Sequence, residues 1–270
     1  MSKSLFEHLS PDTGPKRILA LDGGGVKGLL TLGMLKALED ELRRRAHDAP
    51  SFRLSDYYDL IGGTSTGAII SAGLALGLSV DELIALYQRL GPEVFGKSAG
   101  DGVFLQSKFE SSKLRRALAS VLSTKTMGSE DLKTGLAIHA KRIDTGSAWV
   151  VTNHPLGMFY DPPGDSGTFP NKRYRLADLV LASAAAPTFF DEITIDIEFD
   201  EKRRPIQKGY FVDGAVSANN NPSMQLFMLA LEPSYKFGWK AGADTLMMTS
   251  CGTGARRPSV DGKSFQGLPP

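Results

Sequence analysis

The sequence predicts an α/β fold in which a mainly parallel sheet is covered by helices. Short apolar runs, which are typical of buried strands, alternate along the chain with helical stretches, and such alternation is typical of parallel sheets. Two of the runs lead directly into a glycine-rich turn and then a helix. The composition, 41% hydrophobic and 23% charged over 270 residues, is close to globular averages, and the length suits one large domain.

The first strand-turn-helix unit is expected near the N-terminus. Residues 17–21, Arg-Ile-Leu-Ala-Leu, form a short apolar run that predicts a buried strand. After a glycine turn, apolar residues recur at three- and four-residue steps, which predicts an amphipathic helix from Gly28 to about Arg45. The members of this stripe are Leu29, Leu32, Leu35, Leu38 and Leu42.

The second unit places a serine between a strand and a helix. Residues 57–61 predict a strand, residues 62–67 a glycine-rich turn, and residues 68–76 a helix that is apolar nearly all round. Because a helix of that kind is buried on every side, we expect this unit at the centre of the domain.

The remaining elements continue the alternation. Further strands are expected at 136–140, 149–152, 193–199, 210–212 and 245–249, and helices at 113–122, 176–184 and 222–231. Residues 156–172 are rich in Pro, Gly and Asp and predict a long surface loop. We assign residues 1–16 to an N-terminal extension and 17–270 to the main domain. No closing helix follows the last expected strand, which leaves open whether the native chain continues past Pro270.

Charge and composition exclude several classes of partner. Lys plus Arg (31) nearly balance Asp plus Glu (30), so no global field attracts nucleic acid, and any contact with a membrane is local and peripheral. The N-terminus has no signal pattern, and no run approaches the ~18 apolar residues that span a bilayer. These features predict a soluble, cytoplasmic protein. The lone cysteine, Cys251, excludes an internal disulfide and is expected to pack in the core.

The strongest chemical signal is the G-x-S-x-G pattern of residues 63–67, Gly-Thr-Ser-Thr-Gly. In a nucleophile elbow the flanking glycines permit a turn that is too tight for side chains, and the helix that follows favours developing negative charge. The alternative is a glycine-serine turn without chemistry. The position of the pattern between a strand and a helix favours Ser65 as a nucleophile.

A second glycine motif, residues 22–28, Asp-Gly-Gly-Gly-Val-Lys-Gly, also follows a strand and precedes a helix. It contains G-x-G-x-x-G, the fingerprint of dinucleotide-binding proteins, which would make the chain an NAD(P)-dependent oxidoreductase. That fingerprint expects an acidic residue at the end of the next strand, whereas residues 39–41, Glu-Asp-Glu, fall inside the expected helix. The same amides can instead form an oxyanion hole, and we favour that interpretation.

An activated serine needs a base, and histidine is the usual partner. In the chain order of α/β-hydrolases a histidine follows the acid, but His8, His47, His139 and His154 all precede Asp213. Neither zinc-ligand nor calcium-loop spacing occurs, so no metal is expected. Asp213 remains as the base, because it ends a short apolar strand at the edge where open sheets bind ligands. The alternative is that Asp213 only forms a turn with Gly214.

These motifs, in this order, resemble the patatin-like phospholipase family. The resemblance spans about residues 17–254 and includes 182–187, 220–222 and 250–254. It implies a three-layer α/β/α fold, a Ser-Asp dyad of Ser65 and Asp213, and an oxyanion hole made by Gly23, Gly24 and Gly25. Supporting motif positions are Asp22, Lys27, Gly28, Gly63, Gly67 and Gly214. Lys27 stands where the family more often has arginine, whose planar fork lysine lacks, so the role of Lys27 stays open.

The resemblance implies a lipid acyl hydrolase of the phospholipase A type that forms an acyl-serine intermediate, needs no cofactor and acts on membrane or micellar lipid. The alternative is a ligand-regulated effector or a lipid-binding module of the same fold. The lipid, the acyl position and the oligomeric state stay open. Apolar residues that suit an acyl-chain pocket are Phe95, Val103, Phe104, Phe109, Phe189 and Phe190.

Overall fold

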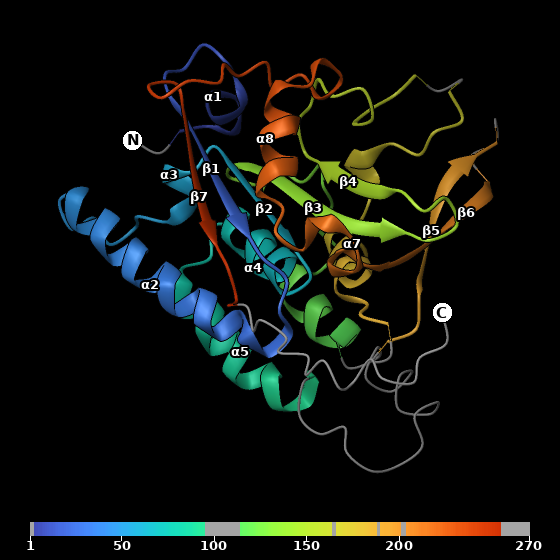
Figure 1. The fold of residues 1–270 in the computed structure, drawn as a ribbon, viewed down its shortest axis with the longest axis horizontal. Coiled ribbons are helices and arrows are strands. Elements are labelled where there is room, and N and C mark those ends of the chain that lie inside the picture. Colours follow the sequence, from blue (N-terminus) through green and yellow to red (C-terminus); the bar gives the residue numbers. More distant parts are fainter. Residues whose placement is uncertain (1–2, 95–113, 164–165, 188–189, 201–203, 255–270) are drawn as a thin grey trace, which may run out of the picture.

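A computed structural model describes residues 3–94, 114–163, 166–187, 190–200 and 204–254 (Figure 1). Their strands form a seven-stranded sheet in the order β5-β6-β3-β2-β1-β7, and β4 pairs with β3 outside this path. The strands are β1 (Lys16–Leu21), β2 (Leu60–Thr64), β3 (Gly135–Arg142), β4 (Ala148–Thr152), β5 (Ile193–Phe199), β6 (Pro205–Asp213) and β7 (Leu246–Cys251).

The sheet has a parallel part and an antiparallel part. Strands β7, β1, β2 and β3 run parallel to one another, as the alternation of strands and helices predicts. Strands β4 and β6 both run antiparallel to β3, and β5 runs antiparallel to β6. The predicted mainly parallel sheet is therefore correct for the part that carries the serine turn.

Two hydrophobic clusters cover the two faces of the sheet. Along β1, Leu19 and Leu21 belong to the larger cluster, whereas Ile18 and Ala20 belong to the smaller one, as expected when successive side chains point to opposite faces. Helices α2 (Gly28–Arg45), α4 (Thr66–Ala75), α5 (Val80–Val94) and α7 (Leu176–Ala184) pack on the first face, and α1 (Leu5–Leu9) and α8 (Ser223–Leu231) on the second. The result is the expected three-layer α/β/α arrangement (Figure 1).

The second strand lies later in the chain than predicted. Residues 57–61 were expected to form it, but Leu54–Tyr57 forms the short helix α3 and the strand is Leu60–Thr64. The strand includes two glycines because neighbouring elements approach it closely. A Cβ on Gly62 would lie 2.5 Å from a methyl carbon of Leu226 in α8. Two of the glycines that suggest a turn, Gly62 and Gly63, therefore lie inside a buried strand.

The N-terminal residues are attached to the sheet by polar contacts. The Asp59 carboxylate, immediately before β2, accepts hydrogen bonds from Lys3 Nζ, His8 Nδ1 and the Arg17 N–H, each at 2.9 Å. The indole of Trp239 donates to the Leu9 carbonyl at 3.0 Å. Helix α1 is thus held at the end of the sheet opposite the serine turn.

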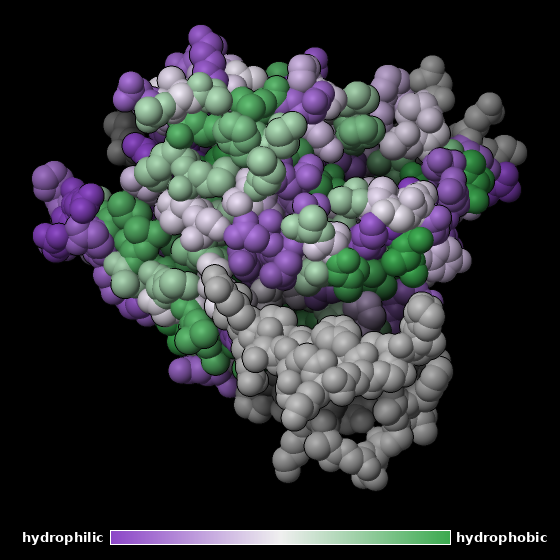
Figure 2. All heavy atoms as spheres, viewed as in Figure 1, coloured by the Kyte–Doolittle hydropathy of each residue, from purple (hydrophilic) through white to green (hydrophobic). Residues whose placement is uncertain are grey.

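The surface of the described residues carries scattered apolar patches. Figure 2 shows hydrophobic surface over α2 and α8, whose exposed apolar residues include Leu29, Leu30, Met224 and Met228. No helix in the part of the chain that the structure describes is both long and apolar enough to cross a membrane. Cys251 is buried, as predicted.

Candidate active site

Two strand ends meet on one edge of β3 and bring Ser65 and Asp213 together. Thr64, the last residue of β2, pairs with His139, whereas Asp213, the last residue of β6, pairs with the adjacent Ala140. Strand β2 is parallel to β3 and β6 is antiparallel to it, so the two strands approach each other end to end. The Ser65 hydroxyl donates a hydrogen bond of 2.6 Å to Asp213 Oδ2.

The backbone at Ser65 has the strained conformation of a nucleophile elbow. Ser65 has φ +56° and ψ −122° and immediately precedes α4, a conformation that a non-glycine residue adopts only where its surroundings enforce it. A Cβ on Gly63 would lie 2.2 Å from the Gly67 carbonyl carbon, and one on Gly67 would lie 2.2 Å from the Leu21 carbonyl oxygen. The two predicted glycines are therefore required for the turn.

Ser183, to which no role was assigned from the sequence, holds the elbow in place. The Ser65 N–H donates to the Ser183 hydroxyl oxygen at 2.8 Å, and that hydroxyl donates to the His139 carbonyl at 2.5 Å. Ser183 lies in α7 and is fully buried. The sequence offers two signals for it: Ser183 is the lone hydroxyl within the apolar segment 179–187, and it lies in the segment 182–187 that resembles the family. Ser183 thus links the nucleophile to the strand beside it.

The Asp213 carboxylate is buried without a cation. It is 3% exposed, and no ion pair among the described residues includes it. Burial raises the pKa of Asp213, although hydrogen bonds from Ser65 and from the Ala215 N–H oppose that rise. A higher pKa makes this carboxylate a stronger base than an exposed aspartate. Gly214 is needed beside it, because a Cβ there would lie 2.8 Å from the His139 carbonyl oxygen.

The glycine loop lies against the serine. A Cβ on Gly23 would be 3.1 Å from Ser65 Cβ. The Gly23 N–H donates to the Asn220 carbonyl at 3.0 Å, and its own carbonyl accepts from the Thr253 hydroxyl at 2.9 Å. Of the three glycines expected to form an oxyanion hole, Gly23 thus has its N–H bonded within the protein. Among the described residues, the N–H groups of Gly24 and Gly25 have no hydrogen-bond acceptor.

The other residues of the glycine motif have separate positions. Burial raises the pKa of Asp22 to about 6, and its Oδ1 is buried without a partner among the described residues. Lys27 is exposed and forms no ion pair within the described ranges. Gly28 lets α2 approach α4, since a Cβ there would lie 2.4 Å from the Thr66 hydroxyl oxygen. The structure thus brings Gly28 but not Lys27 into the packed interior.

Histidine does not take part in the serine contact. The His139 ring lies 3.4 Å from the Gly63 carbonyl and contacts neither dyad side chain by a hydrogen bond. Burial lowers the pKa of His139 and of His154 to about 4, so both rings are neutral near pH 7. His8 is bonded to Asp59 at the far end of β2. The sequence argument against a histidine base is consistent with these positions.

The dinucleotide alternative lacks its acidic residue. Glu39 lies within α2, where its carboxylate accepts hydrogen bonds from Arg43 and from the Val80 N–H. It is therefore not at a strand end, where the fingerprint requires it. Of the apolar residues expected to line an acyl pocket, Phe190 packs partly buried against the larger cluster. The others lie outside the described residues, namely Phe95, Val103, Phe104, Phe109 and Phe189.

A strained serine between a strand and a helix, bonded to a buried carboxylate and flanked by glycine amides, has the geometry in which a serine can act as a nucleophile. The Patatin-like phospholipase family model matches residues 19–227. The chain belongs to this family.

Related proteins match most of this chain but only part of their own length. The chain is 29% identical over 226 residues to the cGAMP-activated phospholipase of Vibrio cholerae, which covers 80% of this chain and 57% of that protein. It is 35% identical over 212 residues to the cUMP-AMP-activated phospholipase of Escherichia coli, covering 77% and 57%. It is 27% identical over 252 residues to Patatin-1-Kuras 2 of Solanum tuberosum, covering 88% and 62%. The chain thus spans less than two thirds of the length of each.

Proposed function

We propose that this chain is a lipid acyl hydrolase in which Ser65 is the nucleophile and Asp213 the general base. The observation that carries the proposal is the 2.6 Å hydrogen bond from the Ser65 hydroxyl to Asp213 Oδ2. The carboxylate has no cationic partner among the described residues, so nothing but the serine hydroxyl and one backbone amide stabilises its charge. It is therefore suited to accept a proton from that hydroxyl.

The reaction proceeds in two balanced steps. As Ser65 Oγ attacks the ester carbonyl, its proton passes to Asp213 Oδ2, and the oxyanion lies against the amides of Gly24 and Gly25. The intermediate collapses to an acyl-serine, and the departing alcohol takes the proton from Asp213. Water then attacks the acyl-serine and gives a proton to the same carboxylate, which returns it to Ser65 as the fatty acid leaves.

The substrate class follows from the family and from the surface beside the glycine loop. Members of the family are named phospholipases, which supports a carboxylic ester of a phospholipid. Val26, Leu29 and Leu30 are 41–61% exposed next to that loop, and Lys27 adds a cation among them. We propose that these side chains contact the surface of a membrane or micelle peripherally, as a cytoplasmic enzyme would, while one lipid enters the site.

The test is covalent labelling together with lipid hydrolysis. A fluorophosphonate should add once to the protein, as measured by intact mass, and fatty acid should be released from phospholipid micelles. Ser65→Ala should abolish both signals. Ser71→Ala is a matched control, since Ser71 is buried in α4, the helix that Ser65 precedes, and its hydroxyl has no partner among the described residues. This variant should keep both signals. Full hydrolysis by Ser65→Ala would refute the proposal.

A second proposal concerns regulation by a nucleotide. Two relatives are named as cGAMP-activated and cUMP-AMP-activated phospholipases, which supports a ligand-regulated effector rather than a constantly active enzyme. Phospholipid hydrolysis should then rise when cGAMP or cUMP-AMP is added to the full protein. Equal rates with and without these nucleotides, from a protein that the fluorophosphonate labels, would exclude this regulation and leave the hydrolase proposal intact.

A further inference from the structure

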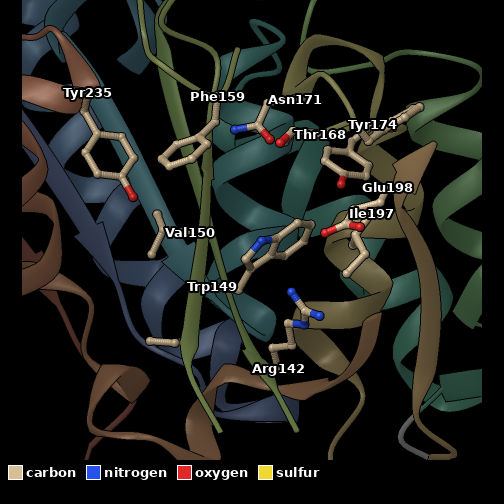
Figure 3. A pocket seen from close by; sticks show the side chains of 12 residues that line it. Arg142, Trp149, Val150, Phe159, Thr168, Asn171, Tyr174, Ile197, Glu198 and Tyr235 are labelled. Carbon is tan, nitrogen blue, oxygen red and sulfur yellow. The ribbon is translucent and has the colours of Figure 1, made fainter. Parts of the chain in front are cut away.

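A cavity separate from Ser65 and Asp213 lies at the outer edge of the sheet, beside β4. Its volume is about 280 Å³, and neither dyad residue lines it. Trp149 and Val150 of β4 form one wall, and residues of the long 156–172 loop form another. Figure 3 shows the side chains that line the cavity. Trp149 lies near the middle of the view, and Arg142 lies below it. The cavity therefore has its own walls and its own opening.

The walls of this cavity, which we call the β4 cavity, are rich in aromatic rings. Trp149, Phe159 and Tyr174 come from three separate segments of the chain, and Tyr235 lies beside Phe159 with 6.2 Å between ring centroids. Trp149 and Tyr174 meet edge to face at 5.3 Å. Several ring faces and edges border one small space, which suits a flat ligand that stacks.

The same walls carry polar groups that have no partner within the described residues. Asn171 is 8% exposed and Tyr174 is 6% exposed; their side-chain polar atoms form no hydrogen bond with a described residue and are not among the fully buried atoms that lack a partner, so they are open to the cavity. Figure 3 shows the Tyr174 hydroxyl pointing toward Glu198 and Trp149. Polar atoms that are open to a cavity can donate hydrogen bonds to a ligand or accept them from it.

The charged residues of the β4 cavity lie where they can complement a polar ligand. Arg142 is held in position, because its Nε and Nη2 donate to the Asp144 carboxylate at 2.7–3.0 Å. Glu198 provides a carboxylate on the β5 side. An acyl chain would offer no hydrogen-bond partner to the Asn171 amide or to the Arg142 N–H groups that Asp144 does not use, which is unfavourable. The cavity is therefore poorly suited to the fatty acid of the substrate.

We propose that the β4 cavity binds the nucleobase of a nucleotide. A base offers a flat ring to Trp149 and Phe159 and polar edges to Asn171 and Glu198, and its phosphate can reach toward Arg142. A volume of about 280 Å³ is near the lower end for ligand sites, so it suits one base rather than a whole dinucleotide. The remaining part of a larger nucleotide would lie outside the cavity.

The β4 cavity contacts both elements that position the dyad. The Trp149 ring lies 4.4 Å from the ring of Phe211, centroid to centroid, and Phe211 precedes Asp213 by two residues in β6. Tyr174 lies just before α7, the helix that carries Ser183. A base stacked on Trp149 would restrict the motion of β6 and α7. An effect of the bound base on Ser65 and Asp213 rests on the nucleotide regulation proposed above. Binding of the base in the cavity does not.

Tryptophan fluorescence tests the proposal without reference to hydrolysis. The chain has two tryptophans; Trp239 is 4% exposed in the smaller hydrophobic cluster, away from the β4 cavity lining. Trp239→Phe therefore leaves Trp149 as the emitter. AMP, GMP, UMP and cGAMP are titrated, and at least one should quench this emission saturably, while ribose 5-phosphate should not. The proposal would be overturned if none of the four nucleotides quenched the emission saturably. It would also be overturned if Trp149→Phe, in which Trp239 is the emitter, were quenched as strongly as Trp239→Phe.

A pair of loop variants guards against a fold defect in the tryptophan variants. Phe159 is 40% exposed and lines the β4 cavity, whereas Leu156 is 70% exposed in the same loop and does not. Phe159→Ala should weaken nucleotide binding, measured by calorimetry, about tenfold, and Leu156→Ala should leave it unchanged. Equal affinities would count against the site. Ser65→Ala should bind as the wild type does, so loss of hydrolysis and loss of binding are distinguishable.

Discussion

Two buried aspartates flank strand β2, and their surroundings are opposite. Asp59 immediately precedes the strand and is fully buried, and it receives hydrogen bonds from Lys3, His8 and the Arg17 N–H. Asp213 lies against Ser65, which immediately follows the strand, and it receives hydrogen bonds from one hydroxyl and one backbone amide only. The first carboxylate has a cationic partner, Lys3, and the second has none among the described residues.

The pKa values show what this difference does. Burial alone would raise the pKa of Asp59, but hydrogen bonds from His8 and Lys3 outweigh it, so the pKa of Asp59 is lowered. Burial raises the pKa of Asp213, and its two hydrogen bonds do not reverse the rise. A carboxylate that is paired stabilises the fold, whereas one that is left unpaired is available as a base. Burial by itself therefore does not distinguish a structural aspartate from a reactive one.

The largest expected effect comes from removing the charge of Asp213. Asp213→Asn removes the general base and should lower the rate of phospholipid hydrolysis by about 10³-fold, within the range for general base catalysis. The melting temperature should stay equal or rise, because the amide has no charge to desolvate. If Asp213→Asn hydrolyses lipid at the wild-type rate, Asp213 is not the base. If the variant unfolds, Asp213 stabilises the fold as Asp59 does.

The opposite outcome is expected at Asp59. Asp59→Asn leaves the partners of a buried carboxylate uncompensated and should lower the free energy of unfolding by about 3 kcal/mol, as when one member of a buried ion pair is removed. Denaturant titration followed by circular dichroism measures this loss. Fatty-acid release per folded molecule, measured well below the midpoint, should not change. A loss of activity greater than the loss of folded protein would show that Asp59 acts on the site.

Local motifs were enough to find the dyad residues but not their surroundings. Ser65 and Asp213 each lie in a short pattern at a strand end, and strand ends of one sheet meet at predictable edges. Ser183 and Thr253 contact the site only through packing between elements far apart in the chain. The occupied amide of Gly23 likewise depends on Asn220, whose position the sequence does not specify.

The fold was predicted where apolar runs matched buried strands. The strand before the serine was placed too early because Tyr57 and Tyr58 favour a strand locally, whereas glycine disfavours one. The structure requires Gly62 and Gly63 in that strand, since α4 and α8 lie too close for side chains. Tertiary packing overrides local preference at this position, which a single sequence does not show.

A smaller effect is expected at Ser183, which connects the catalytic elbow to β3. Ser183→Ala leaves the buried Ser65 N–H without an acceptor, at a penalty of about 1–3 kcal/mol, and should lower kcat about tenfold while KM stays near the wild-type value. Ser183→Thr keeps a hydroxyl and should recover part of the loss. The rate of fluorophosphonate labelling gives an independent measure of the elbow. If Ser183→Ala labels and hydrolyses as fast as Ser71→Ala, the hydrogen bond does not position the nucleophile.

The smallest effect is a difference in how stability depends on pH. The folded-state pKa of Asp59 is lowered, so its ionised form stabilises the fold above the unfolded value, about 3.9, and this contribution is lost as pH falls through the folded value. The folded-state pKa of Asp213 is raised, so its ionisation costs stability as pH rises above about 3.9. The wild type should therefore lose stability relative to Asp213→Asn as pH rises, and gain it relative to Asp59→Asn. Unfolding midpoints of the three proteins from pH 3 to pH 7 measure both differences. The base forms when pH passes the raised folded-state pKa of Asp213, so hydrolysis should rise at the upper end of the interval, where the stability cost levels off. Two differences of the same sign would mean that Asp213 is stabilised in its charged form, as Asp59 is, and is then a weak base.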